Sequence, residues 1–268
     1  MRAESAIINI LGVAVTAPSL VAAAPVPWTI GQSVQTTSGP VQGHAASGAV
    51  QVSEYLGIPY AQPPIGTLRF QPPAKFVGSS TINGSSFPTV NATLPDGFAT
   101  LGVPASAVSV LTVLADAGPQ SEDCLTLNIG DPKKAVLVWI HGGAFTTANN
   151  GQFIADQTDV VLVSLNYRLN VFGFPGNPNS APNLGLLDVR LAVQWIRDNI
   201  ENFGGDANRI TLFGQSAGGS LVDYYSYAYA SDPIANGFIS MSGTANGFGI
   251  FTNETVNAKW FNITSATP

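Results

Sequence analysis

Two apolar runs stand out in the hydrophobic pattern of the middle of the chain. Residues 135–140 and 160–165 are apolar apart from Ser164, and neither run contains a charged side chain. A strand that is buried on both faces gives such a continuous run, whereas a half-exposed strand alternates between apolar and polar residues. The two runs therefore predict inner strands of a parallel sheet.

The pattern changes to helical spacing further along the chain. Between residues 184 and 203 apolar residues recur every three or four positions, and Gly204 and Gly205 follow the segment. A short strand is predicted over residues 209–213, a helix from Ser216 onward, and another strand over residues 237–242. Alternating strands and helices predict an α/β fold, with a mainly parallel sheet and helices on both of its faces.

The N-terminal part of the chain lacks this alternation. Residues 33–60 are divided by glycines into short strands, which we expect to form an antiparallel extension of the sheet. Residues 78–118 are rich in Ser, Thr, Asn, Pro and Gly without a clear period, and we expect a long surface loop there.

The first residues have the pattern of a cleaved secretory signal. Residues 6–24 are uncharged and mostly small or apolar, and they follow Arg2. A membrane anchor is the alternative, but Pro18 interrupts the run, which is short for a bilayer span. We therefore expect a signal peptide over residues 1–24 and a secreted domain over residues 25–268.

Export agrees with four candidate glycosylation sites. Asn-x-Ser/Thr sequences occur at Asn83, Asn91, Asn253 and Asn262. Cys124 is the only cysteine of the chain, so it has no disulfide partner within it.

The composition excludes several classes of protein. Of the 268 residues, 45% are hydrophobic and 10% are charged, which is enough apolar surface for a folded core and too much for a disordered chain. The formal net charge of −6 argues against nucleic acid as a partner. Two histidines and one cysteine cannot form a structural zinc site, and no dinucleotide or phosphate-loop motif occurs. We therefore expect no metal and no cofactor.

The sequence Gly214-Gln215-Ser216-Ala217-Gly218 lies between a predicted strand and a predicted helix. This is the position of a nucleophile elbow, a strained turn that lifts a serine hydroxyl above the edge of a sheet. Small residues two positions before and after the serine, here Gly214 and Gly218, let neighbouring backbone approach closely. Ser216 is therefore the candidate nucleophile.

A second motif, His141-Gly142-Gly143-Ala144-Phe145, follows the predicted strand at 135–140. Glycines at this place let backbone N–H groups point into a cleft and stabilise an oxyanion. The candidate donors are the N–H groups of Gly143, Ala144 and Ala217. His141 precedes the serine along the chain, so we expect it to support its loop rather than to act as the base.

Taken together, these motifs and six further blocks resemble the type-B carboxylesterases, a family that includes carboxylesterases, cholinesterases and fungal secreted lipases. The further blocks are YLGIPYAQPP (55–64), LRF (68–70), SEDCLTLN (121–128), NYR (166–168), NLGLLD (183–188) and NFGGD (202–206). The resemblance implies an α/β-hydrolase fold, hydrolysis of small-molecule carboxylic esters through an acyl-enzyme, no cofactor and no obligate protein partner. It also implies structural ion pairs of Arg69 with Glu122 and of Arg168 with Asp188.

The chain departs from the family pattern after the serine. The family places an acid and then a histidine far beyond the elbow, whereas no histidine follows His141 here. The chain therefore resembles the N-terminal half of the family's proteins, and we expect a truncated α/β-hydrolase fold. Asp223 and Asp232 follow Ser216, but with no histidine to orient we expect both to be surface charges.

Three hypotheses about function follow. The favoured one is an N-terminal portion of a secreted serine esterase, which alone has at most background activity because its serine lacks a base. The second is a non-catalytic, esterase-like binding or adhesion module. The third is an active short esterase with a different base.

Overall fold

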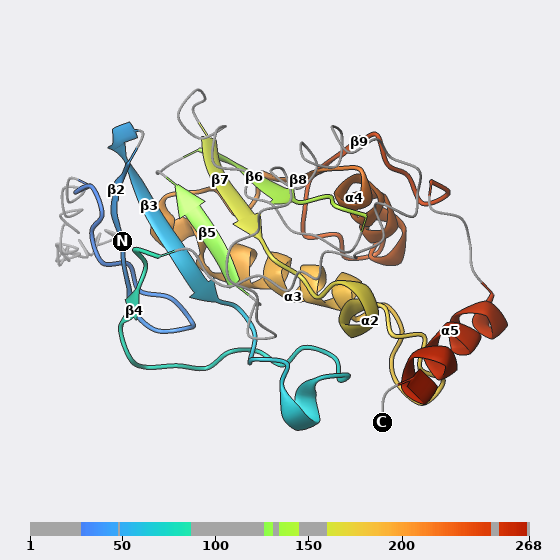
Figure 1. The fold of residues 1–268 in the computed structure, drawn as a ribbon. Helices are drawn as coiled ribbons and strands as arrows, with labels where there is room; N and C mark the ends of the chain where they lie inside the picture. The colour runs from blue at the N-terminus through green and yellow to red at the C-terminus, as the bar shows by residue number, and fades with distance from the viewer. Residues whose placement is uncertain are drawn as a thin grey trace, which may run out of the picture.

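The centre of the fold is a seven-stranded sheet (Figure 1). The computed structural model describes residues 28–47, 49–86, 126–130, 134–144, 160–247 and 252–266. Within them the strand order is β2-β3-β5-β7-β6-β8-β9. The strands are β2 (His44–Ala46), β3 (Ala49–Pro59), β5 (Thr126–Gly130), β6 (Ala135–Ile140), β7 (Val160–Leu165), β8 (Ile210–Gln215) and β9 (Gly237–Met241).

This sheet has a parallel half and an antiparallel half. β7, β6, β8 and β9 run parallel to one another. β2, β3 and β5 pair antiparallel with their neighbours, and β1 (Val41–Gln42) pairs with β4 (Ile82–Asn83) in a separate small sheet. The predicted α/β fold with an N-terminal antiparallel extension is confirmed. β5, which joins the two halves, was not predicted.

Two long helices pack beside each other on the sheet, and α4 lies against β8 and β9 (Figure 1). α3 (Leu184–Asn199) continues into the 3-10 helix η4 (Ile200–Phe203), which ends at Gly204 with a left-handed φ of 81°. α4 (Ala217–Ala228) follows β8. The Arg190 guanidinium on α3 donates a 2.9 Å hydrogen bond to the Tyr225 hydroxyl on α4. The shorter or more peripheral helices are η1 (Gly66–Leu68), α2 (Asn170–Gly173) and α5 (Asn253–Ala266).

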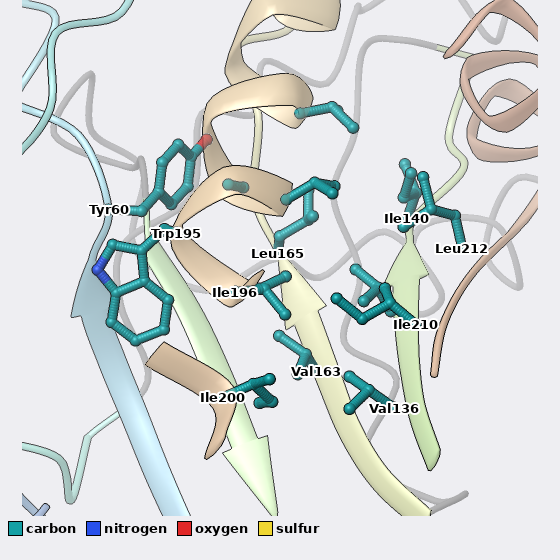
Figure 2. Close-up of a cluster of buried hydrophobic side chains, with 14 of the residues drawn as sticks. Tyr60, Val136, Ile140, Val163, Leu165, Trp195, Ile196, Ile200, Ile210 and Leu212 are labelled. Atoms are coloured by element: carbon teal, nitrogen blue, oxygen red, sulfur yellow. The ribbon is translucent and has the colours of Figure 1, made fainter. Parts of the chain in front are cut away.

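The core lies between these helices and the sheet (Figure 2). Alternate residues of β6 are fully buried, and the strand register places them beside buried residues of β7 and β8. Each such aliphatic side chain contributes roughly 1.5–3 kcal/mol on burial. The buried strand residues are Val136, Val138, Ile140, Val161, Val163, Leu165, Ile210 and Leu212, and those facing them are Trp195, Ile196 and Ile200.

The periphery is less completely covered. At the β9 end of the described sheet, Phe238, Ile239 and Met241 are exposed. Among the described helices, none combines the length and the apolar character that a bilayer span requires.

Candidate active site

The strand-to-helix turn at Ser216 is strained. β8 ends at Gln215 and α4 begins at Ala217, so Ser216 alone forms the turn, with φ 56° and ψ −122°. A side chain is disfavoured in this region of backbone space, and residues held there against strain cluster at functional sites. The Ser216 side chain is half-buried. The structure therefore has the local geometry that the sequence motif predicts.

Glycines let the end of β6 touch this turn. A Cβ atom added to Gly218 would lie 2.0 Å from the carbonyl oxygen of Ile140, and one added to Gly214 would lie 2.5 Å from the backbone of Gly218. A Cβ atom on Gly142 would lie 2.5 Å from the carbonyl oxygen of Gln215. No side chain fits at these positions without moving backbone, so the close approach depends on glycine.

The glycine-rich loop after β6 lies beside the serine. The same added Cβ atom on Gly142 would lie 3.2 Å from the Cβ atom of Ser216. Gly143 and Ala144 follow with φ of 105° and 52°, so two successive residues adopt left-handed or related backbone conformations. The structure thus brings the predicted oxyanion loop next to the predicted nucleophile.

His141 anchors this loop from within the protein. Its ring is fully buried and stacks on the ring of Tyr167, with centroids 4.5 Å apart and an interplanar angle of 16°. The Tyr167 hydroxyl donates a 2.9 Å hydrogen bond to the His141 carbonyl oxygen. Sequence reasoning did not find Tyr167 as a residue of this region, although it lies in the NYR block.

Burial keeps the His141 imidazole neutral. Desolvation lowers its pKa to about 4, although the hydrogen bond to Gly142 acts in the opposite direction. The Nδ1 atom lies 2.9 Å from the Gly142 carbonyl oxygen, which can only accept, so Nδ1 holds the proton. Within the part of the chain that the structure describes, the buried Nε2 atom has no hydrogen-bond partner. These features suit a structural role better than that of a general base.

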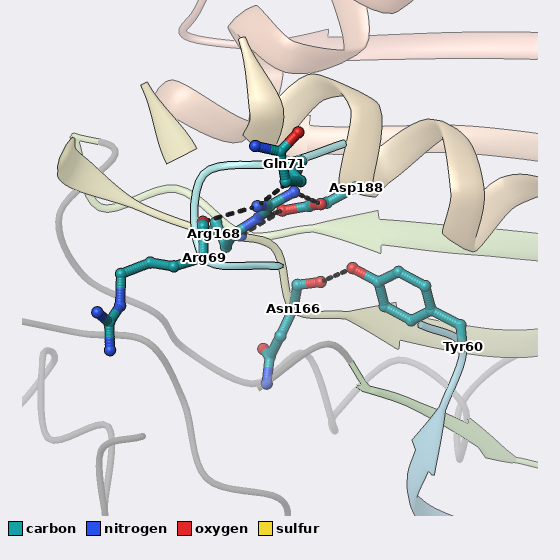
Figure 3. Close-up of polar contacts among 6 residues, drawn as sticks. All are labelled: Tyr60, Arg69, Gln71, Asn166, Arg168 and Asp188. Carbon is teal, nitrogen blue, oxygen red and sulfur yellow. Dashed lines mark hydrogen bonds and ion pairs between the residues drawn. The ribbon is translucent and has the colours of Figure 1, made fainter. Parts of the chain in front are cut away.

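A buried ion pair braces the segment after β7 (Figure 3). Arg168 donates from Nη2 to Asp188 Oδ1 at 2.6 Å and from Nε to Asp188 Oδ2 at 2.8 Å. Its remaining nitrogen, Nη1, donates to the carbonyl oxygens of Arg69 and Gln71 at 3.2 and 2.9 Å. Tyr60 donates to the Asn166 carbonyl oxygen at 2.7 Å. Arg168 and Asp188 are thus paired as the resemblance implies.

The other candidate residues have different positions. Glu122, the expected partner of Arg69, lies outside the described residues, as do Asn91, Cys124 and the expected signal peptide. The sequons at Asn83, Asn253 and Asn262 are exposed.

The two aspartates after Ser216 differ from each other. Asp232 is an exposed residue that pairs with Arg190, as expected of a surface charge. Asp223 is half-buried, and its Oδ2 accepts a 2.7 Å hydrogen bond from the Ala245 N–H. The prediction that Asp223 is only a surface charge was wrong, because a neighbouring loop covers it.

Comparison with known proteins identifies the family. Residues 31–264 match the sequence profile of the carboxylesterase family. The chain belongs to this family. It is 39% identical over 234 residues to the chlorogenic acid esterase of Aspergillus niger, an alignment that covers 81% of this chain and 45% of that protein.

More distant members and a solved structure give the same result. Secreted lipase 5 of Gibberella zeae is 35% identical, covering 81% of this chain and 46% of that protein. Acetylcholinesterase of Gallus gallus is 37% identical, and that alignment covers 80% of this chain and 30% of that protein. The structure of a thermophilic PNB esterase aligns with a TM-score of 0.71 at 31% identity, covering 88% of this chain and 48% of that one. This carboxylesterase-family chain therefore spans less than half the length of these relatives.

Proposed function

We propose that this chain contains the nucleophile and the oxyanion loop of a secreted carboxylic ester hydrolase, as an N-terminal portion without the triad acid and histidine. Its substrates are small-molecule carboxylic esters, and it uses no cofactor. The main support is the turn at Ser216, whose strained backbone lies against the glycine-rich loop at Gly142.

In this proposal Ser216 Oγ attacks the carbonyl carbon of the ester. The carbonyl oxygen becomes an oxyanion that accepts hydrogen bonds from the N–H groups of Gly143, Ala144 and Ala217. The bond to the alcohol oxygen then breaks, the alcohol leaves with a proton, and an acyl-Ser216 ester remains. Water hydrolyses this ester to release the acid and restore the serine.

The proton of Ser216 needs an acceptor, and His141 does not provide one. Its Nδ1 proton is bonded to Gly142, and burial lowers the pKa of the ring to about 4. No histidine follows it in the sequence. Serine hydrolases without their triad keep a residual acceleration of about 10³–10⁴ over water, from oxyanion stabilisation and binding. We expect at most that residual rate from this chain alone.

Two measurements on the purified full chain test this function. A fluorophosphonate probe is expected to label Ser216 slowly, as mapped by peptide mass spectrometry, and p-nitrophenyl acetate hydrolysis is expected to exceed the rate of Ser216→Ala slightly. Ser265→Ala removes an exposed serine on α5 and is the matched control, with no expected change. Labelling and turnover equal to those of Ser216→Ala would instead support the non-catalytic binding module.

Export is a separate part of the proposal. The exposed positions of Asn83 and Asn253 suit glycans, and a relative of the chain is named a secreted lipase. Expression in a fungal host is expected to give a secreted, glycosylated protein that begins near residue 25. Intact mass before and after enzymatic deglycosylation measures both features, and an unmodified chain that keeps its first residues contradicts them.

A further inference from the structure

The segment after β9 holds the Ser216 backbone from the side opposite to the oxyanion loop. The Ser216 N–H donates a 2.8 Å hydrogen bond to the Met241 carbonyl oxygen. A Cβ atom added to Gly243 would lie 1.9 Å from the Ser216 carbonyl oxygen. The strained peptide at Ser216 is therefore in direct contact with the backbone of residues 241–243.

Side chains of α4 fix this segment in turn. Ser220 Oγ donates to the Thr244 carbonyl oxygen at 2.8 Å. Asp223 Oδ2 accepts from the Ala245 N–H at 2.7 Å, and the Tyr224 hydroxyl donates to the Ala245 carbonyl oxygen at 2.8 Å. Both backbone polar groups of residue 245 are thus bonded to successive residues of α4, the helix that follows the serine.

The protonation of Tyr224 favours this arrangement. Burial, and to a lesser extent the charge of Asp223, raise the pKa of the Tyr224 hydroxyl. The hydroxyl therefore remains a donor at neutral pH. A carboxylate that accepts from a backbone N–H forms a charge-assisted hydrogen bond, which is stronger than a neutral one.

We propose that Asp223 is a positioning residue for the nucleophile, which acts by holding residues 242–247 against α4 so that Met241 and Gly243 keep the Ser216 peptide in its strained turn. Tyr224 has the same role to a smaller degree. Asp223 contacts no reacting atom in this scheme. The inference rests on the proposed nucleophilic role of Ser216.

Asp223→Ala, Asp223→Asn and Asp232→Ala in the full chain test this role. Asparagine keeps an oxygen that can accept from the Ala245 N–H, whereas alanine does not. Asp232 is the matched control, because it is a second aspartate near α4 that pairs with Arg190 rather than with residues 242–247. The first readout is hydrogen exchange at the Ser216 amide, followed by nitrogen-15 NMR, which does not depend on any activity.

We expect Asp223→Ala to accelerate exchange at Ser216 about tenfold, because loss of a charge-assisted hydrogen bond has an effect of that order. Asp223→Asn is expected to remain within about threefold of the parent, and Asp232→Ala to leave exchange unchanged. If Asp223→Ala does not fold, Tyr224→Phe, which removes only the hydroxyl, is expected to give a smaller acceleration. Unchanged exchange in a folded Asp223→Ala or Tyr224→Phe protein overturns the inference, as does equal acceleration in Asp223→Asn and Asp223→Ala.

The second readout is the rate at which a fluorophosphonate probe labels Ser216. We expect it to fall about tenfold in Asp223→Ala and to recover in Asp223→Asn. Altered exchange with unaltered labelling overturns the positioning role and leaves a purely structural one. If the parent chain is not labelled above Ser216→Ala, the proposed function fails, and the exchange measurement still decides whether Asp223 holds the Ser216 peptide.

Discussion

Two neighbouring residues after β7 belong to two buried polar regions that differ in charge. Tyr167 faces the site region, where His141, Ser216 and the glycine-rich loop are uncharged and held by backbone contacts. Arg168 faces the scaffold region, where its charge is compensated by Asp188 and its remaining donors reach backbone carbonyls. His141 and the residues that touch it are uncharged, whereas the scaffold region is organised around a pair of opposite charges.

This difference determines how each region fails. In the scaffold region the buried charges depend on each other, so removing one side chain leaves a buried charge without compensation. In the site region the backbone segments touch through glycines, so adding atoms or a proton is the damaging change. The predictions that follow test this contrast.

The largest effect is expected from Asp188→Ala. Arg168 would keep its charge in a site that is almost completely buried, and breaking such a pair typically costs about 3–5 kcal/mol. Urea unfolding measures the loss. The control is Asp198→Ala, which breaks the more exposed pair with Arg197 and is expected to cost at most about 1 kcal/mol. Similar losses in the two variants would contradict the distinction between the regions.

Acid is expected to destabilise the site region through His141. Its folded-state pKa of about 4 lies below the ordinary value of 6.5, so the unfolded state binds the proton more readily. The part of the free energy of unfolding that depends on a neutral His141 is therefore complete above pH 6.5. It is lost as the pH falls from 6.5 to 4 and amounts to about 3 kcal/mol.

NMR can follow this titration directly, because the chain has only two histidines. The His141 imidazole signals are expected to stay in the neutral form down to about pH 4, with the proton on Nδ1. Urea unfolding at a series of pH values gives the matching loss of stability. A His141 midpoint near 6.5 would show that the ring is not held in the buried, neutral state described.

An intermediate effect is expected from Gly218→Ala, which adds one methyl group at the contact with Ile140. The new atom would lie 2.0 Å from a carbonyl oxygen, and overpacking of this kind costs about 1–3 kcal/mol and displaces backbone. We expect both the free energy of unfolding and the rate of fluorophosphonate labelling of Ser216 to fall in this variant.

Gly66→Ala separates this steric effect from backbone strain. Gly66 has a φ of 54°, but among the described residues no atom beyond its own chain neighbours and helix backbone lies within 4 Å of an added Cβ. We expect a cost of about 1 kcal/mol from left-handed strain and no change in labelling. Equal effects of the two alanine variants on labelling would mean that the contact of β6 with the elbow does not matter for the serine.

The sequence predicts those features that are encoded locally. Inner strands and α3 were found because burial on both faces, or on one helical face, leaves a clear hydrophobic period. The turn at Ser216 was found because a strained turn flanked by glycines needs a short motif. β5 and α5 were missed: β5 has only two large apolar residues, Leu127 and Ile129, and the helix over Asn253–Ala266 has no marked apolar face.

Contacts between distant segments could not be predicted in the same way. Two hydrogen bonds near the serine each join residues more than 20 positions apart: that from Ser216 to Met241 and that from Ala245 to Asp223. No spacing rule relates an aspartate on a helix to the N–H group of a loop, because the contact depends on how α4 packs beside β9. Asp223 lies in no motif and was therefore interpreted as a surface charge. Asp188 lies in a family motif, so its pairing with Arg168 could be predicted.

The smallest effect is also the only stabilising one, and it concerns the strain itself. Ser216→Gly removes the side chain that makes φ 56° and ψ −122° unfavourable, so we expect the free energy of unfolding to rise by about 1 kcal/mol while fluorophosphonate labelling is abolished. Ser226→Gly, in the last turn of α4, should instead lower stability by about 0.5–1 kcal/mol, because glycine adds entropy to the unfolded chain and the hydrogen bond of Ser226 Oγ to the Asp223 carbonyl oxygen is lost. Urea unfolding of both variants measures the difference. A loss of stability in Ser216→Gly would mean that the serine side chain stabilises its turn rather than straining it.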